Sequence, residues 1–214
     1  MAFHFAGLFR PDVFETLREL RPGFVRTPGG NYLEGFGPRT RWDWKKTLGP
    51  AAARPGHYNA AWRYWVTDGL GLYELLTLCE LLGAPCQMSV YSGYSMGAPY
   101  VPLNESGVFA DEACDLLDFA NAAEGSSRWA ATRASMGHAA PFGLHRLEVM
   151  DCHLIALDCT RALMGHVAPF GPHHLEVMDC HLIAFGLHCF EVGNEERLMA
   201  SGCSWSLLVA SGCF

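Results

Sequence analysis

Two neighbouring polar residues near the end of the chain are of the types that carboxylate-based hydrolytic sites use. The segment FEVGNEER, residues 190–197, starts as a short apolar strand, reaches Gly193 and then presents Asn194 and Glu195. A carboxylic acid can protonate a leaving oxygen, and a neutral amide beside it can donate to a hydroxyl group without changing the charge of the pair. Side chains alternate along a strand, so both reach one pocket only where the strand ends or bulges, which Gly193 eases. From these residues alone, Glu195 is either a catalytic carboxylate at the end of a strand or a surface glutamate at the start of a loop.

A second candidate group follows a strand near the start of the chain. Residues 23–26 read as a short buried strand ending in Arg26, and Pro28, Gly29 and Gly30 stop it, because a proline and two glycines cannot continue a ladder. Asn31 then lies at the strand's C-terminal mouth. The same residues also favour a tight turn for backbone reasons alone. Asn31 is thus either a ligand-facing amide or part of a turn.

The spacing of apolar residues predicts the elements that carry these groups. Helical periodicity alternates with short buried runs, which is the rhythm of parallel β/α units whose functional loops follow the C-terminal ends of strands. A loop rich in Trp, Gly and Pro runs to about Tyr64 and is expected to wrap over a site or a neighbouring element. The predicted helices are 11–22, a segment capped by Thr67 or Asp68 and ended by Gly83, and a segment capped by Asp111; the predicted strands are 23–26, 85–91 and the run that begins at Phe190.

The last third of the chain contains a near-identical duplication. Residues 132–156 return as residues 160–184, with 21 of 25 positions identical at an offset of 28. Solenoid units keep a pattern while their sequences drift, and they need three or more copies. Both copies contain LEVMDC, whose sequence resembles FEVGNE. We therefore interpret the duplication as an insertion, expected to be irregular, that separates the last strand from the rest.

The net charge and the composition of the two termini limit the kinds of ligand and membrane association that we expect. The formal net charge is −7 without a block of like charge, which argues against nucleic-acid and anionic-membrane surfaces and fits a neutral or carbohydrate ligand. The opening MAFHFAGLFRPD lacks the basic and apolar regions of a secretory signal, and the apolar tail 198–214 is too interrupted to span a bilayer. We expect no signal peptide and no transmembrane helix, and the compartment stays open.

Cysteine and histidine are abundant but do not form a recognisable metal motif. The chain has nine cysteines and no CxxC pair, and eight of its ten histidines lie between His138 and His188. Their spacing fits none of the usual zinc patterns, so we predict neither a metal nor another cofactor. A Cys/His metal-binding protein built on the repeated MDCH segments remains an alternative.

Several motifs in order resemble glycoside hydrolase family 51, the retaining α-L-arabinofuranosidases. They are RTPGGNYLEGF, RWDWKKTLGP, RPGHYNAAWRYWVTDGLG, RASMGHAAPFGL and EVGNEER. The resemblance covers about residues 24–144 and resumes at about 185–197. It implies an α/β fold, namely part of a (β/α)8 TIM barrel comprising about strands two to four with their helices. It also implies four units: 1–144 as partial catalytic domain, 145–184 as insertion, 185–199 as fourth barrel strand and 200–214 as low-complexity tail.

The resemblance assigns roles to five residues. It implies that Glu195 is the general acid/base and that Asn194 contacts the sugar. It likewise implies that Asn31 is a sugar-binding amide, that Trp62 is a pocket aromatic and that Arg26 braces the nucleophile. Packing alone would also account for Trp62, and a carboxylate partner alone for Arg26.

The implied activity is removal of terminal arabinofuranosyl groups from arabinan- and arabinoxylan-type polysaccharides. The family's nucleophile lies on the seventh strand, which this chain does not reach, so we expect the chain to be inactive as it stands. A non-catalytic carbohydrate-binding remnant is the alternative. The expected partners are arabinose-containing saccharides and, through open barrel edges, a second copy of the chain. Family members are often extracellular.

Overall fold

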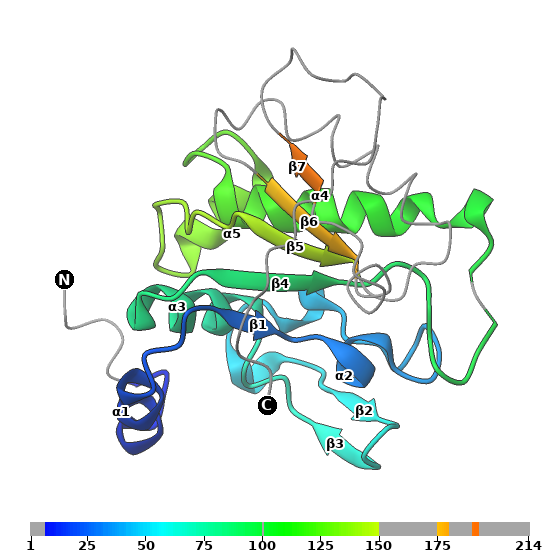
Figure 1. Cartoon of the computed structure of the whole chain (residues 1–214), viewed down its shortest axis with the longest axis horizontal. Coiled ribbons are helices and arrows are strands. Elements are labelled where there is room, and N and C mark those ends of the chain that lie inside the picture. Colours follow the sequence, from blue (N-terminus) through cyan, green and yellow to red (C-terminus); the bar gives the residue numbers. More distant parts are fainter. Residues whose placement is uncertain (1–6, 100, 150–174, 180–189, 193–214) are drawn as a thin grey trace.

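The computed structural model describes residues 7–99, 101–149, 175–179 and 190–192, and its centre is a sheet flanked by helices (Figure 1). The helices are α1 (Pro11–Glu19), α2 (Gly30–Glu34), α3 (Leu72–Leu82), α4 (Gly107–Asn121) and α5 (Arg128–Ser135). The strands are β1 (Val25–Thr27), β2 (His57–Asn59), β3 (Tyr64–Val66), β4 (Cys86–Val90), β5 (Arg146–Val149), β6 (Leu175–Asp179) and β7 (Phe190–Val192). Short 3-10 turns lie at Trp44–Thr47, Ala51–Ala53 and Leu103–Glu105.

The main sheet has the order β1-β4-β5-β6-β7 within the described residues. The first four of these strands run parallel, and β7 pairs antiparallel with β6. A separate antiparallel hairpin is formed by β2 and β3. The alternation of helices with parallel strands confirms the predicted α/β class, because parallel neighbours need a crossover such as a helix.

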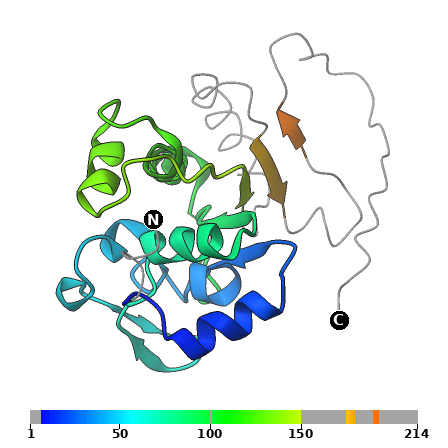
Figure 2. The same ribbon diagram turned by 90° about the vertical axis from the view of Figure 1, so that its left-hand side faces the viewer.

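The hydrophobic core lies between one face of the sheet and the helices. Met88 of β4 and Leu147 of β5 are directly opposite each other and fully buried in it. Figure 2 shows α4 and α5 on one side of β5 and β6. Trp42 and Trp44, from the aromatic loop, are also buried in this core. The expectation that this loop packs over a neighbouring element is therefore confirmed.

The predicted elements up to residue 121 are present, but the caps differ. The helix α3 begins after Gly71, whose N–H donates to Glu74 Oε2 at 2.9 Å, and not after Thr67 or Asp68. A side chain at Gly71 would collide with the Thr47 backbone oxygen, so close packing selects glycine there. The helix α4 likewise begins four residues before Asp111.

The segment expected to be an irregular insertion contains two strands. β5 and β6 both lie within 145–184, and β5 occupies the place beside β4 that the sequence assigned to the strand at Phe190. This corrects both expectations, and the reason is physical. LEVM has the same apolar, β-branched character as FEV, and it is the first such run after α5.

The entry of the chain into β5 is fixed by one side chain. Asn121, at the end of α4, accepts from the Leu144 N–H at 2.7 Å and donates to the Leu144 carbonyl at 2.8 Å. Leu144 is buried. Whatever follows Leu144 is thus directed into the place beside β4. In the described part of the chain, none of the helices has the length and apolar character needed to cross a membrane.

Candidate functional site

Three polar side chains meet on the sheet face opposite the core. Met88 and Val90 of β4 turn toward the helices, so the intervening Ser89 points to the other face. There Glu148 of β5 accepts hydrogen bonds from Ser89 Oγ at 2.6 Å and from Arg26 Nε at 2.5 Å, both on its Oε2. Glu148 is 2% exposed, whereas the Arg26 side chain is 38% exposed. The cluster spans β1, β4 and β5.

Arg26 therefore has a carboxylate partner within this chain. The resemblance implies that Arg26 braces the nucleophile, which stays a prediction, and the structure shows an ion pair of Arg26 with Glu148. Because guanidinium and carboxylate neutralise each other, the pair places a polar, fixed and nearly neutral group on this face. Sequence reasoning missed Glu148. A sequence signal for Glu148 does exist. It is a glutamate within an apolar strand, in a sheet in which another strand carries an arginine.

Asn31 lies at the C-terminal end of β1. It is the second residue of α2, it is exposed, and the chain reaches it through Gly29 and Gly30, which both have positive φ (75° and 58°). A side chain at Gly29 would meet the Arg26 guanidinium within 2.7 Å. Glycine is thus favoured at both positions by the positive φ, and at Gly29 also by the close contact with Arg26. The two glycines place Asn31 just after the C-terminal end of β1. Figure 1 shows α2 directly beyond the tip of the β1 arrow.

Trp62 lies in the turn between β2 and β3. It is 56% exposed, so it does not fill the core. Its backbone is fixed, because Asn59 Oδ1 accepts from the N–H groups of Ala61 and Trp62 at 3.1 Å each. A large aromatic ring that is exposed on a fixed turn is accessible to a ligand, and the role of Trp62 as a pocket aromatic stays a prediction.

A buried carboxylate lies between the β2–β3 hairpin and α2. Asp68 faces His57 Nδ1 at 3.0 Å and accepts a hydrogen bond from the Tyr32 hydroxyl at 3.3 Å. Burial and the Asp68 carboxylate raise the pKa of Tyr32 above its ordinary value. Tyr32 therefore stays protonated and acts as a donor.

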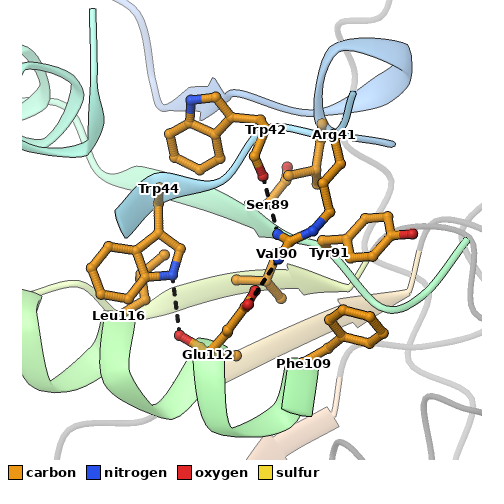
Figure 3. Close-up of a pocket in the computed structure, with 11 residues that line it drawn as sticks. Arg41, Trp42, Trp44, Ser89, Val90, Tyr91, Phe109, Glu112 and Leu116 are labelled. Atoms are coloured by element: carbon orange, nitrogen blue, oxygen red, sulfur yellow. Dashed lines mark hydrogen bonds and ion pairs between the residues drawn. The ribbon is translucent and has the colours of Figure 1, made fainter. Parts of the chain in front are cut away.

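The hollow shown in Figure 3 has a structural role. It lies between the aromatic loop, β4 and α4, and its volume is about 10 Å³, near the lower limit for one water molecule. The Arg41 guanidinium lies 4.9 Å from the Tyr91 ring centre and pairs with Glu112 at 2.8 Å. Trp44 Nε1 donates to the Glu112 carbonyl at 3.2 Å. An ion pair and aromatic rings fill this junction, which leaves no room for a sugar.

The structure brings only some of the predicted site residues into view. Arg26, Asn31 and Trp62 are described, whereas Asn194 and Glu195 lie outside the described residues, and their roles stay predictions. Within the described residues no group of three or more His, Cys, Asp or Glu side chains could hold a metal ion.

Comparison with known proteins then decides the family. The model of the α-L-arabinofuranosidase 1 domain matches residues 16–156, about two thirds of the chain. The chain belongs to this family. Arabinofuranosidase-family membership is also evident from α-L-arabinofuranosidase 2 of Arabidopsis thaliana, which is 38% identical over 141 residues, and from α-L-arabinofuranosidase A of Aspergillus niger, which is 32% identical over 143 residues.

Solved structures agree with the family and the fold. An arabinose-bound family 51 α-L-arabinofuranosidase matches with a TM-score of 0.70 and 38% identity, covering 79% of this chain and 27% of its own. The α-L-arabinofuranosidase of Thermotoga maritima, in complex with arabinose, has a TM-score of 0.56 at 22% identity, covering 80% of this chain and 33% of its own, and supports the fold alone. This chain is thus a partial family 51 arabinofuranosidase domain.

The partial extent is pronounced. The match covers 66% of this chain but 21% of the Arabidopsis relative, and 65% of this chain but 22% of the Aspergillus niger relative. The family match ends at residue 156, so it includes β5 and stops before FEVGNEER. The strand beside β4 in this arabinofuranosidase-family chain is therefore the one that the family model recognises.

The Arg26–Glu148 pair gives a first test of the cluster. We expect Glu148→Gln to lower the free energy of unfolding by about 2 kcal/mol, because a buried charged acceptor with two donors is lost while Arg26 keeps partial access to water. Urea unfolding would measure this. Glu19→Gln, at the exposed end of α1, is the matched control and should change stability by about 0.5 kcal/mol or less. Equal effects of the two substitutions would contradict the cluster's role.

Proposed function

We propose that this chain is the arabinofuranosyl-binding part of a retaining α-L-arabinofuranosidase that acts on terminal arabinofuranosyl groups of arabinan- and arabinoxylan-type polysaccharides. In this proposal the described strands form part of a (β/α)8 barrel, with β1, β4 and the strand beside β4 as its second to fourth strands. The observation that carries it is the gathering of Arg26 and Asn31 at the C-terminal end of β1, in a chain of this family.

The reaction needs two carboxyl groups. One protonates the leaving oxygen, and a second, about 5 Å away, attacks the anomeric carbon to form a covalent glycosyl intermediate that water then hydrolyses. We assign the acid/base role to Glu195 and a sugar-hydroxyl contact to Asn194. Two such neighbouring carboxyl groups cannot easily both ionise, so the acid keeps its proton at working pH. The nucleophile's strand belongs to the part of the family barrel beyond this chain's fourth strand.

The strand beside β4 is the reason to expect binding without hydrolysis. Aligning LEVMDC with FEVGNE places Asp151 where Asn194 stands in the later copy, and Cys152 where Glu195 stands. The strand paired with β4 is β5, and in the sequence Asp151 and Cys152 come after it. In sequence, the third residue after Val149 is thus a cysteine, whereas the third residue after Val192 is the proposed acid.

A non-catalytic carbohydrate-binding remnant stays the alternative, and in either case Asn31 and Trp62 are exposed and accessible to a saccharide. The division at residues 144, 184 and 199 stays a proposal, now with β5, and not a strand within 185–199, in the place beside β4. Self-association also stays a proposal. It follows from the open sheet, whose edge strands within the described residues are β1 and β7. The cysteines and histidines of the MDCH segments, on which the Cys/His alternative rests, lie outside the described residues.

Calorimetry with linear arabino-oligosaccharides tests the proposal, with xylo-oligosaccharides as the control ligand. We expect binding of the arabinose ligand and no release of nitrophenol from 4-nitrophenyl arabinofuranoside. Asn31→Ala should weaken binding about tenfold, the effect of losing one or two hydrogen bonds to a sugar. Absence of binding, or equal binding by Asn31→Ala, would overturn the assignment.

A further inference from the structure

Asn31 and Trp62 are carried by different elements, and a single carboxylate joins those elements. Asn31 lies on α2, and its neighbour Tyr32 points its hydroxyl at Asp68. Trp62 lies on the β2–β3 hairpin, whose first residue His57 faces the same carboxylate with Nδ1 at 3.0 Å. The rings of Tyr32 and His57 also meet edge to face, with centres 5.4 Å apart.

Asp68 is itself held in place. It is 3% exposed and has a left-handed backbone with φ of 55°, a conformation that aspartate tolerates better than most residues. Arg54, whose side chain is 1% exposed, donates to the Asp68 carbonyl at 2.6 Å and pairs with Glu74 of α3 at 2.7 Å. The carboxylate is therefore fixed to the body of the domain through α3.

The hairpin passes this rigidity on to Trp62. His57 and Asn59 alternate with exposed Tyr58 on β2, so they share the buried face of the hairpin. Asn59 is 3% exposed, and its Oδ1 holds the backbone N–H of Trp62. The Asp68 carboxylate thus contacts His57, strand β2 connects His57 to Asn59, and the Asn59 side chain accepts from the Trp62 N–H.

We propose that Asp68 is a positioning residue that sets the distance between the Asn31 amide and the Trp62 ring, through the contacts of its carboxylate with Tyr32 and His57. This inference rests on the proposed function, because it assigns these two side chains to one saccharide. Asp68 itself touches no substrate. It acts by making α2 and the hairpin one rigid unit, so that a sugar meets the amide and the ring without the cost of ordering them.

The test uses the whole chain labelled with 5-fluorotryptophan, in which Trp62→Phe identifies the Trp62 signal by ¹⁹F NMR. Tyr32→Phe removes only the hydroxyl that donates to Asp68. We expect it to shift or split the Trp62 signal and to weaken binding of an arabino-oligosaccharide about 3- to 10-fold, the size of one lost buried hydrogen bond. Asp68→Asn should move the same signal.

Tyr73→Phe is the matched control, since Tyr73 is a buried tyrosine on α3 outside this link. It should leave the Trp62 signal and the affinity unchanged even if it lowers the melting temperature. If Tyr32→Phe and Tyr73→Phe act alike on both measurements, the positioning role is overturned. If the Trp62 signal moves while the unsubstituted chain binds no saccharide, the link between the elements is supported and it is the proposed function that fails.

Discussion

Deletion of residues 145–187 is expected to tighten binding of arabino-oligosaccharides by about tenfold or more. The deletion joins Leu144 to His188 and produces MGHAAPFGLHCFEVGNEER. Because Asn121 fixes Leu144 at the entrance to the sheet, FEV is then directed into the place beside β4. Glu191 would replace Glu148 as the partner of Arg26 at the same distance along the chain. Asn194 and Glu195 would follow at the end of that strand.

Calorimetry of the purified deletion variant measures this gain. Hydrolysis is still not expected, because the proposed mechanism needs a second carboxylate from a later strand. Adding Asn194→Ala to the deletion should remove most of the gain, since that amide is the new sugar contact.

A shorter deletion separates this explanation from a general benefit of removing the duplication. Deleting residues 157–184 removes 28 residues, the repeat offset, but leaves β5 intact after Leu144. This variant should bind no better than the full chain. Similar gains in both deletion variants would mean that β5 beside β4 is not what limits binding.

The sequence predicted the helices and strands well where local signals are strong. Pro11, the stripe that ends at Gly83 and the apolar run after Pro85 each mark an element that the structure contains. The caps were harder, because Gly71 is selected by its contact with Thr47, which is distant in sequence. Aspartate is a residue type that often caps helices, but the Asp68 side chain instead contacts Tyr32 of α2 and His57 of the hairpin.

The strand beside β4 shows a second limit of sequence reasoning. Periodicity cannot tell whether LEVM or FEV forms the strand beside β4, since both are short apolar runs with a glutamate at the second position. Chain order and the Asn121–Leu144 hydrogen bonds decide between them. For the same reason, the partner of Arg26 could be found only once the pairing of β5 with β4 was known.

The largest expected loss of stability follows from replacing Arg133 in α5. This side chain is fully buried, and its guanidinium donates to four backbone carbonyls, those of Phe119, Ala122, His138 and Ala139, at 2.7 to 3.1 Å. Arg133→Met preserves much of the volume but leaves these acceptors buried without a donor. We expect a loss of about 4 kcal/mol in the free energy of unfolding, measured by urea denaturation.

Arg128→Met, on the same helix, is the control. The Arg128 side chain is 74% exposed, so its loss should cost about 0.5 kcal/mol or less. Equal costs for the two variants would show that the four carbonyls are satisfied in another way when Arg133 is absent.

The same contacts explain why the first copy of the duplication takes the place beside β4. The second copy repeats this arginine as Arg161, followed by a nearly identical sequence, ALMGHVAP in place of ASMGHAAP. Two of the four carbonyls, however, come from the end of α4, at Phe119 and Ala122, which precede the first copy directly. Arg133, from the first copy, occupies both of them. Arg133→Met should therefore also weaken the pairing of β5 with β4, which hydrogen exchange of the β5 amides would detect as faster exchange than in Arg128→Met.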